Sequence, residues 1–182
     1  IEQQGHVVGR NWQQELGLPT YHEEWECLAR PRNGISQRRV QFIVMDQSRT
    51  RLPGNPRLQP DAIELPASCE LELHHTGFVV GTVFSYACGF GELKSLIPAA
   101  LGIEIPTDLE GDYIVGTAQL FDSALADKAW EGIQRGIFSH VCPVVFQPAG
   151  VPTGTGQLVQ VALACSDFPG CPNARIVRAW EA

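Results

Sequence analysis

The chain has 182 residues, which is long enough for one domain with a substantial core, and its formal net charge is -7. This acidic balance argues against a protein that holds nucleic acid through phosphate contacts, because such proteins present a basic face. No apolar run approaches the roughly 20 residues that a membrane-spanning helix needs, so we expect neither a nucleic-acid partner nor a membrane partner.

The cysteine pattern predicts free thiols rather than a metal site or a disulfide framework. The six cysteines are Cys27, Cys69, Cys88, Cys142, Cys165 and Cys171. No two of them have the Cys-x-x-Cys spacing of a zinc knuckle, and a chain of this size needs no disulfides to fold. We therefore expect mostly reduced thiols, no bound metal and no cofactor.

The first part of the chain, residues 1–38, is polar and irregular, because glycine and proline interrupt any regular period. We expect an N-terminal arm or small appended element there, followed by one main domain over residues 39–182. Trp12, Tyr21 and Trp25 give the arm aromatic side chains. Such side chains are favoured anchors in interfaces, so the arm is expected either to dock on a neighbouring subunit or to pack on its own domain.

Most of the main domain is predicted to be short strands. Residues 39–45 are rich in β-branched and aromatic side chains, and residues 70–74 alternate polar and apolar, as a half-buried strand does. Apolar runs predict further strands at residues 79–84, 112–120, 142–146, 157–164 and 175–180.

Only two helices are predicted in the main domain, at residues 93–101 and 124–135. The second has a good N-cap in Asp122 or Ser123 and a glycine, Gly136, at its C-terminal end. Many short strands with few helices predict an α+β fold: a mainly antiparallel β-barrel or curled sheet with a few short helices.

Residues 135–146 place a thiol, Cys142, where a helix-like run gives way to a strand-like run, with Ser139 and His140 close by. Nucleophiles often occur at such joints, because a rigid element holds the side chain at a fixed angle to its base. The alternative is that Cys142 is a small buried residue that begins a core strand, since free cysteine is among the most buried residue types.

Four blocks of sequence follow one another in a recognisable order. They are the strand around Phe42-Ile43-Val44; Leu73-His74 followed by Val80-Gly81; Asp112-Tyr113-Ile114-Val115-Gly116 followed by a helix and Arg135-Gly136; and Val161-Ala162-Leu163-Ala164 followed by Pro172-Asn173-Ala174-Arg175. In this order they resemble the prohead (capsid-maturation) proteases of tailed phages, which share a β-barrel fold with the herpesvirus capsid proteases. The resemblance covers residues 40 to 180.

The resemblance implies a prohead-protease-like domain that cleaves the scaffold or capsid protein of the same virus. It implies a place in the host cytoplasm, inside the procapsid or associated with the virion, and it allows a homo-oligomer. By position, Cys142 corresponds to the family's nucleophilic serine and His74 to its catalytic histidine, although a register shift of one residue would select His75. Gln160 corresponds to the family's acidic residue on the late strand.

If Cys142 and His74 lie on neighbouring strands and face one cleft, they form a nucleophile and its base. Either His140 or Gln160 is then expected to orient the imidazole, although neither is an acid. Ser139 is the alternative nucleophile. A zinc site from His74, His75 and a cysteine is a weaker alternative, because adjacent histidines in a strand point to opposite faces.

Three departures from the family pattern leave the activity open. Pro143, directly after the cysteine, has no backbone N–H for an oxyanion hole, the glycine that follows in the family is lost, and Gln160 replaces an acid. Two hypotheses therefore remain: an active cysteine peptidase, and a catalytically inactive protease-fold protein with a structural or capsid-associated role in the virion.

Overall fold

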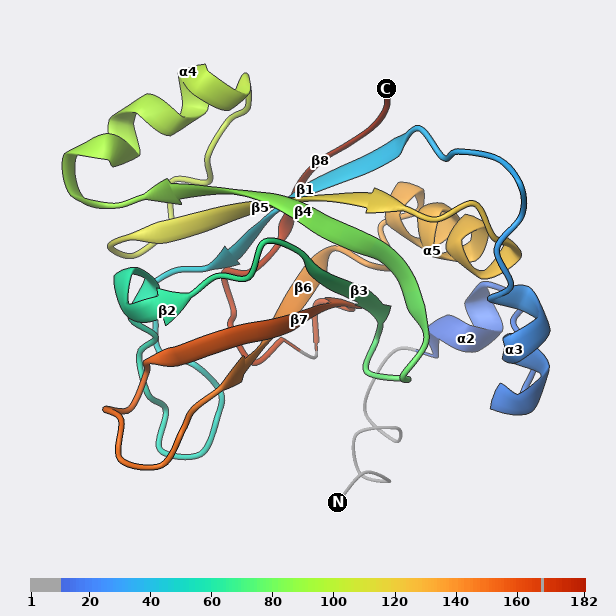
Figure 1. The fold of residues 1–182 in the computed structure, drawn as a ribbon, viewed down its shortest axis with the longest axis horizontal. Coiled ribbons are helices and arrows are strands. Elements are labelled where there is room, and N and C mark those ends of the chain that lie inside the picture. The colour runs from blue at the N-terminus through green and yellow to red at the C-terminus, as the bar shows by residue number, and fades with distance from the viewer. Residues whose placement is uncertain (1–10, 168) are drawn as a thin grey trace.

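The structure is a computed structural model that describes residues 11–167 and 169–182. In that part of the chain one eight-stranded sheet forms the body of the molecule (Figure 1). Its strands are β1 (Arg38–Met45), β2 (Ile63–Glu64), β3 (Cys69–Leu73), β4 (Val79–Gly89), β5 (Tyr113–Leu120), β6 (His140–Phe146), β7 (Gly156–Ala164) and β8 (Ile176–Glu181). The α-helices are α2 (Trp12–Glu15), α3 (Trp25–Leu28), α4 (Ile97–Leu101) and α5 (Ala124–Gln134), and the 3₁₀ helices are η1 (His22–Glu24), η2 (Pro60–Ala62) and η3 (Gly91–Leu96).

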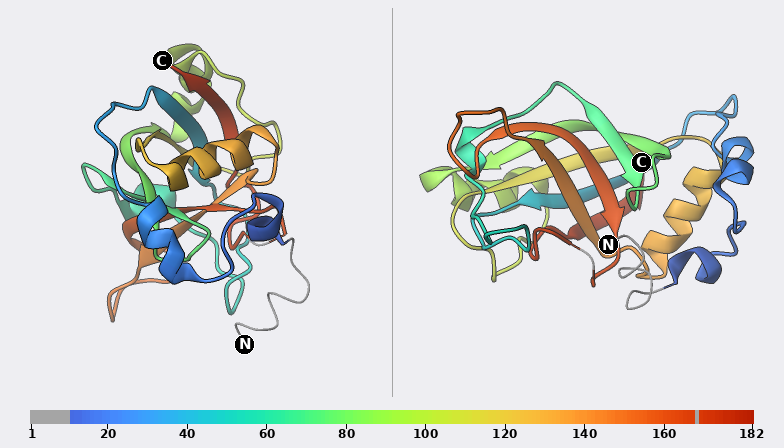
Figure 2. Two further views of the ribbon diagram at one scale, coloured as in Figure 1. Left: turned by 90° about the vertical axis from the view of Figure 1, so that its right-hand side faces the viewer. Right: turned by 90° about the horizontal axis from the view of Figure 1, so that it is seen from below.

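The strands lie in the order β2-β7-β3-β4-β5-β1-β8, and β6 pairs with β7. Most pairs are antiparallel, but β7 runs parallel to both β2 and β3, so the sheet is mixed rather than antiparallel throughout. The sheet curls around a core without closing into a barrel, as the two views of Figure 2 show. The predicted α+β class with a curled sheet and a few short helices is confirmed, whereas the closed β-barrel is not observed.

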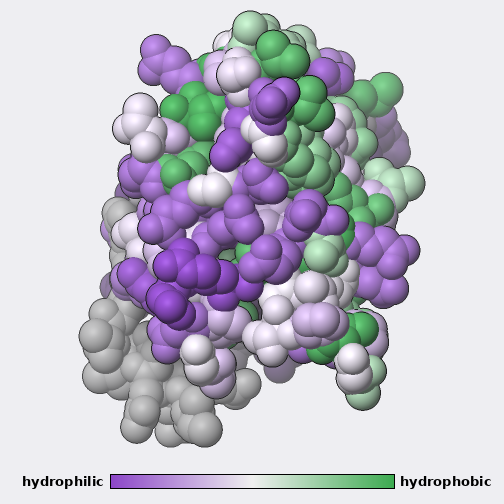
Figure 3. All heavy atoms as spheres, turned by 90° about the vertical axis from the view of Figure 1, so that its left-hand side faces the viewer, coloured by the Kyte–Doolittle hydropathy of each residue, from purple (hydrophilic) through white to green (hydrophobic). Residues whose placement is uncertain are grey.

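Alternation along β1 divides the two faces of the sheet. Val40 and Phe42 are fully buried in the main core, while Ile43 belongs to a smaller cluster on the opposite face. Tyr113 and Val115 of β5 complete this second cluster, and apolar side chains of α4 cover it. Figure 3 shows the end of the molecule that carries α4, with hydrophilic residues over the centre and hydrophobic residues toward the upper rim.

Helix α5 begins and ends as its sequence predicts. The Ser123 side chain accepts a hydrogen bond from the Ala126 backbone N–H at 3.1 Å, and Gly136 follows the helix with a left-handed φ of 72°. Gly132 lets the helix approach the core closely, because a Cβ there would lie 2.5 Å from Cδ2 of Phe138. Of the two predicted N-caps, Ser123 is therefore the one used.

The two short helices α2 and α3 pack beside α5 at one end of the sheet (Figures 1 and 2). Trp12 is 5% exposed and Trp25 is fully buried, and their rings meet edge to face at a centroid distance of 5.8 Å. Both belong to the main core, so packing on the chain's own domain is confirmed and docking of these two rings on a neighbouring subunit is wrong. Tyr21, which is 69% exposed, is the aromatic side chain left at the surface.

Across residues 11–167 and 169–182, none of the helices has both the length and the apolar character needed to cross a membrane.

Candidate functional site

Cys142 lies at one end of a row of three residues on neighbouring strands. In the strand register, Cys142 of β6 faces Ala162 of β7, and Ala162 faces Glu72 of β3. Residues directly opposite one another in a sheet project from the same face. The next row, which includes Val141 and Leu163, belongs to the main core, so the row of Cys142 lies on the outer face of the sheet.

Two loops cover this part of the outer face. The backbone N–H of Arg51, in the loop after β1, donates to the carbonyl of Gly170 at 2.7 Å. Gly170 lies directly over the thiol, since a Cβ on this glycine would lie 3.9 Å from Sγ of Cys142. Cys142 is therefore half-buried, although it is on the outer face.

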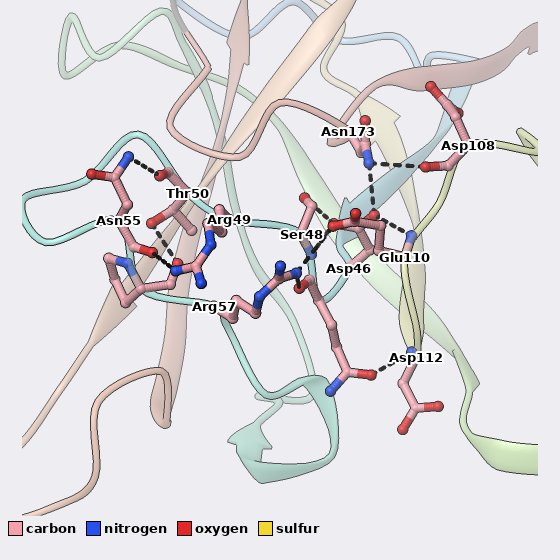
Figure 4. Close-up of polar contacts among 12 residues, drawn as sticks. Asp46, Ser48, Arg49, Thr50, Asn55, Arg57, Asp108, Glu110, Asp112 and Asn173 are labelled. Carbon is pink, nitrogen blue, oxygen red and sulfur yellow. Dashed lines mark hydrogen bonds and ion pairs between the residues drawn. The ribbon is translucent and has the colours of Figure 1, made fainter.

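Asp46 fixes the loop after β1 to the segment before β8 (Figure 4). Its buried carboxylate accepts hydrogen bonds from the backbone N–H of Ser48 at 3.0 Å, from the backbone N–H of Glu110 at 2.9 Å and from Nδ2 of Asn173 at 2.9 Å. A buried carboxylate with several donors is strongly held. The segment that covers Cys142 is therefore anchored through Asn173, rather than free to move alone.

The surroundings of Cys142 keep its thiol protonated. Burial raises the pKa of Cys142, the carboxylate of Glu72 raises it further, and a hydrogen bond with the Gly170 backbone lowers it in part. The neighbouring thiol of Cys171 has its pKa raised to about 12, chiefly by burial and then by Cys142 and Asp46. Both thiols are consequently neutral near neutral pH, and a neutral thiol is a poor nucleophile.

His74 lies beyond the end of β3, in the turn to β4. Its backbone N–H donates to the carbonyl of Leu163 at 2.9 Å, and its φ is 51°. Its ring lies against Trp12, at a centroid distance of 5.1 Å. His75 follows with a φ of 59° and is exposed. The left-handed pair and Gly77 reverse the chain here.

The expectation that His74 and Cys142 lie on neighbouring strands is wrong, because β7 separates β3 from β6. The sequence pattern could not reveal this, since the parallel pairing of β3 with β7 joins distant parts of the chain. In addition, the described residues contain no group of three or more histidine, cysteine or acidic side chains that could hold a metal ion, which leaves the zinc alternative without a site in that part of the chain.

His140 begins β6, two residues before Cys142, and therefore projects from the same face of the strand. Its Nδ1 lies 2.7 Å from Oγ of Ser139, a hydroxyl–imidazole hydrogen bond. Burial lowers the pKa of His140, and the charges of Arg175 and Arg51 lower it further. The imidazole is thus neutral near neutral pH.

Gln160 lies on β7, opposite Val144 of β6 and Glu70 of β3. It is two residues from Ala162, so it shares the outer face with the row of Cys142. The structure thus gathers Cys142, His140 and Gln160 on one face of two paired strands, while His74 belongs to the turn at the end of β3.

Sequence reasoning missed the residues that decide the character of the site. Glu72 alternates with apolar residues, which predicts a solvated side chain, yet it is 4% exposed and accepts from the backbone N–H of Gly77 at 2.9 Å. Arg51 lies in the loop after β1, and no local pattern indicates that the backbone of this loop bonds to Gly170. No signal in the sequence indicates that the segments near Gly170 and Arg51 fold over the face of Cys142.

Comparisons with known proteins give no independent identification of this arrangement. No protein-family model matches the sequence, and no curated protein or solved structure matches it either. What the site can do chemically therefore follows from its own geometry. It combines a protonated thiol, a buried carboxylate and a neutral imidazole on the outer face of a curled sheet.

Proposed function

We propose that this chain is a capsid-associated phage protein that has the fold of the prohead proteases but does not use Cys142 as a nucleophile. Two facts support the fold part of the proposal: the four sequence blocks in family order, and the curled α+β sheet whose strands carry them. One observation carries the functional part. Cys142 is opposed by the carboxylate of Glu72 across Ala162, with its thiol held in the neutral form.

The chemistry of acyl transfer explains why this arrangement opposes catalysis. A cysteine peptidase attacks with a thiolate, which needs a nearby positive charge or base, whereas a carboxylate and burial both favour the thiol. Pro143 also lacks the backbone N–H that an oxyanion hole would use next to the nucleophile. The proposed role is binding: the chain attaches to the scaffold or capsid protein of the same virus during assembly.

A second candidate, the active peptidase, is favoured by one specific contact. The backbone of Gly170 hydrogen-bonds the thiol of Cys142 and lowers its pKa, and backbone donors stabilise a thiolate. In this candidate Cys142 is the nucleophile and His74 the base, and the loop over Gly170 together with the turn that carries His74 would have to rearrange when substrate binds.

Incubation with the purified capsid and scaffold proteins of the same virus separates the two candidates. The wild-type protein, Cys142→Ala and the control Cys88→Ala, which removes a half-buried thiol elsewhere, are compared by gel electrophoresis and co-sedimentation. We expect no cleavage by any of the three proteins and equal co-sedimentation. Cleavage by the wild type and by Cys88→Ala, but not by Cys142→Ala, would establish the peptidase instead.

A further inference from the structure

A cluster of basic side chains lies on the outer face beside Cys142. Arg175 is opposite His140 in an isolated antiparallel bridge, so their side chains project from the same face. Arg51 joins them from the loop after β1, where its backbone is bonded to Gly170. Burial, then the charge of Arg175 and then that of Arg51 lower the pKa of His140, which places both guanidinium groups within electrostatic reach of the imidazole.

The N–H groups of the two arginines have few acceptors among the described residues. Within the described part of the chain, the Arg51 side chain has neither an ion pair nor a hydrogen bond. Arg175 forms an ion pair with Asp108, but its Nε is buried without a hydrogen-bond partner among the described residues. Two like charges that share one small region repel each other, and a buried donor without an acceptor costs stability. Both costs are relieved by an anion.

We propose that Arg51, Arg175 and His140 form a binding site for a carboxylate group of a peptide segment in the partner protein. Arg175 is already paired with Asp108 and His140 is neutral, so the guanidinium of Arg51 is the positive charge of this cluster that has no ion-pair partner among the described residues. One positive charge matches a carboxylate, whereas a phosphate monoester carries nearly two negative charges. Arginine offers a planar pair of N–H donors that fits the two oxygens of a carboxylate.

His140 contributes a further donor to this site. In the tautomer in which Nδ1 accepts from the Ser139 hydroxyl, the proton of the imidazole is on Nε2 and is available to the carboxylate. His140 and Cys142 share one face of β6, so the proposed carboxylate site lies beside the segment that covers the thiol. The inference deepens the proposed function, on which its choice of a peptide as ligand rests.

Fluorescence anisotropy with three labelled peptides tests the site directly. The probes are a short glycine- and alanine-rich peptide with one central glutamate and an amidated C-terminus, its glutamine counterpart, and the glutamine peptide with a free C-terminal carboxylate. We expect the wild-type protein to bind either carboxylate peptide about tenfold more tightly than the amidated glutamine peptide, because a charge-assisted bond to arginine is lost in the latter. Whichever of the two carboxylate peptides binds more tightly identifies a side-chain or a terminal carboxylate as the ligand.

Two arginine variants decide whether the effect is local. Arg51→Gln is expected to abolish the preference for carboxylate, while Arg49→Gln, an exposed arginine that donates to the carbonyl of Asn55, is expected to leave it unchanged. Because Arg51 is exposed, its substitution leaves the fold intact, which circular dichroism checks. Equal binding of all three peptides by the wild type, or equal losses in both variants, would overturn the inference. A fourth labelled peptide carries phosphoserine in place of the glutamate, and tighter binding of this peptide than of the carboxylate peptides would also overturn it.

The peptide assay and the capsid assay can fail separately. If the carboxylate peptides show no preference while the capsid or scaffold protein still co-sediments, the carboxylate site is wrong and the proposed function stands. If the preference is observed but neither viral protein co-sediments, the site stands and the proposed function is wrong.

Discussion

Cys142 and Glu72 lie on either side of Ala162 in one row of the sheet, and alanine has only a small side chain. Glu72 is 4% exposed, and its carboxylate accepts a hydrogen bond from the backbone N–H of Gly77. Its negative charge and the burial of the thiol act in the same direction on Cys142, since both favour the neutral form. Burial is thus the main cause of the neutral thiol, and a carboxylate two strands away adds to it.

Removing this charge is expected to make the thiol more reactive. Glu72→Gln keeps an acceptor for the backbone N–H of Gly77 but removes the negative charge that raises the pKa of Cys142. We expect the alkylation rate of Cys142 by iodoacetamide at neutral pH to rise severalfold, because a larger fraction of the thiol is then ionised. Mass spectrometry of the folded protein at several pH values measures the rate.

Glu70→Gln is the matched control, because Glu70 lies on the same face of β3 opposite Gln160 rather than opposite Ala162. Its alkylation rate at Cys142 is expected to equal that of the wild type. In every variant the rate should increase with pH, because the thiolate fraction grows as the pH approaches the raised pKa. An unchanged rate in Glu72→Gln would contradict the electrostatic account.

The candidate site could be predicted from the sequence only where local pattern decides the outcome. The strand after α5 is a local feature and is found, but it begins at His140, so Cys142 lies inside the strand rather than at the joint. The burial of Glu72 is not local, because alternation along one strand says nothing about loops that fold over it. The charges of Arg51 and Arg175 both act on His140, although the three residues come from distant segments of the chain, so this arrangement is not local either.

At the scale of elements, α2 and α3 are too short to be stable as isolated helices, and they rely on packing. Trp25 has its ring in the main core and its Nε1–H bonded to the carbonyl of Pro19 at 2.9 Å. Trp12 joins Trp25 to Phe138, whose ring centroid lies 5.3 Å from that of Trp12. The N-terminal helices are therefore part of the folded body rather than an independent arm.

Loss of the Trp25 ring is expected to destabilise the whole protein. Trp25→Ala should lower the free energy of unfolding by about 3–5 kcal/mol, because it opens a cavity in the main core. Tyr21→Ala, which removes an exposed aromatic ring from the same segment, should change it by less than about 0.5 kcal/mol. Urea unfolding followed by circular dichroism measures both, and equal effects of the two variants would contradict the packing described here.

The strands and α5 could be predicted from periodicity and caps, but their neighbours could not. The apolar run at residues 157–164 predicts a strand, and β7 pairs with β6 in antiparallel fashion. On its other edge β7 pairs in parallel with β2 and β3. These pairings join strands that are far apart in the sequence, so they depend on the path of the whole chain. For this reason the sequence could not show that β7 separates β3, which precedes His74, from β6, which carries Cys142.

At the scale of the molecule, the sheet has a well-paired centre and weakly paired ends. β5 is paired with β4 from Tyr113 to Leu120 on one side and with β1 from Ile114 to Gln119 on the other. β2 is two residues long, and among the described strands it pairs with β7 alone. β6 meets the segment before β8 at the single bridge between His140 and Arg175, so the curled sheet is held together there by few bonds.

Hydrogen exchange should reflect this gradient. We expect the amides of β5 to exchange most slowly, close to the rate set by global unfolding, and those of β2 to exchange fastest among the strands. β8, which pairs with β1 on one side, should fall between them. Mass spectrometry of peptides from the exchanged protein measures the rates, and protection of β2 equal to that of β5 would contradict the expected order.

The parallel pairing of β3 with β7 has a consequence for how the chain is made. β4 pairs with one edge of β3 as soon as it is made, but Glu70 on the other edge pairs with Gln160, so β5, α5 and β6 leave the ribosome before β7 is available. Until then the edge of β3 exposes unpaired backbone groups, and such an edge can pair with another nascent chain. Pairing between distant segments is also slow to form. The edge of β3 that later receives β7 is therefore the place where two nascent copies of this chain can pair wrongly during synthesis.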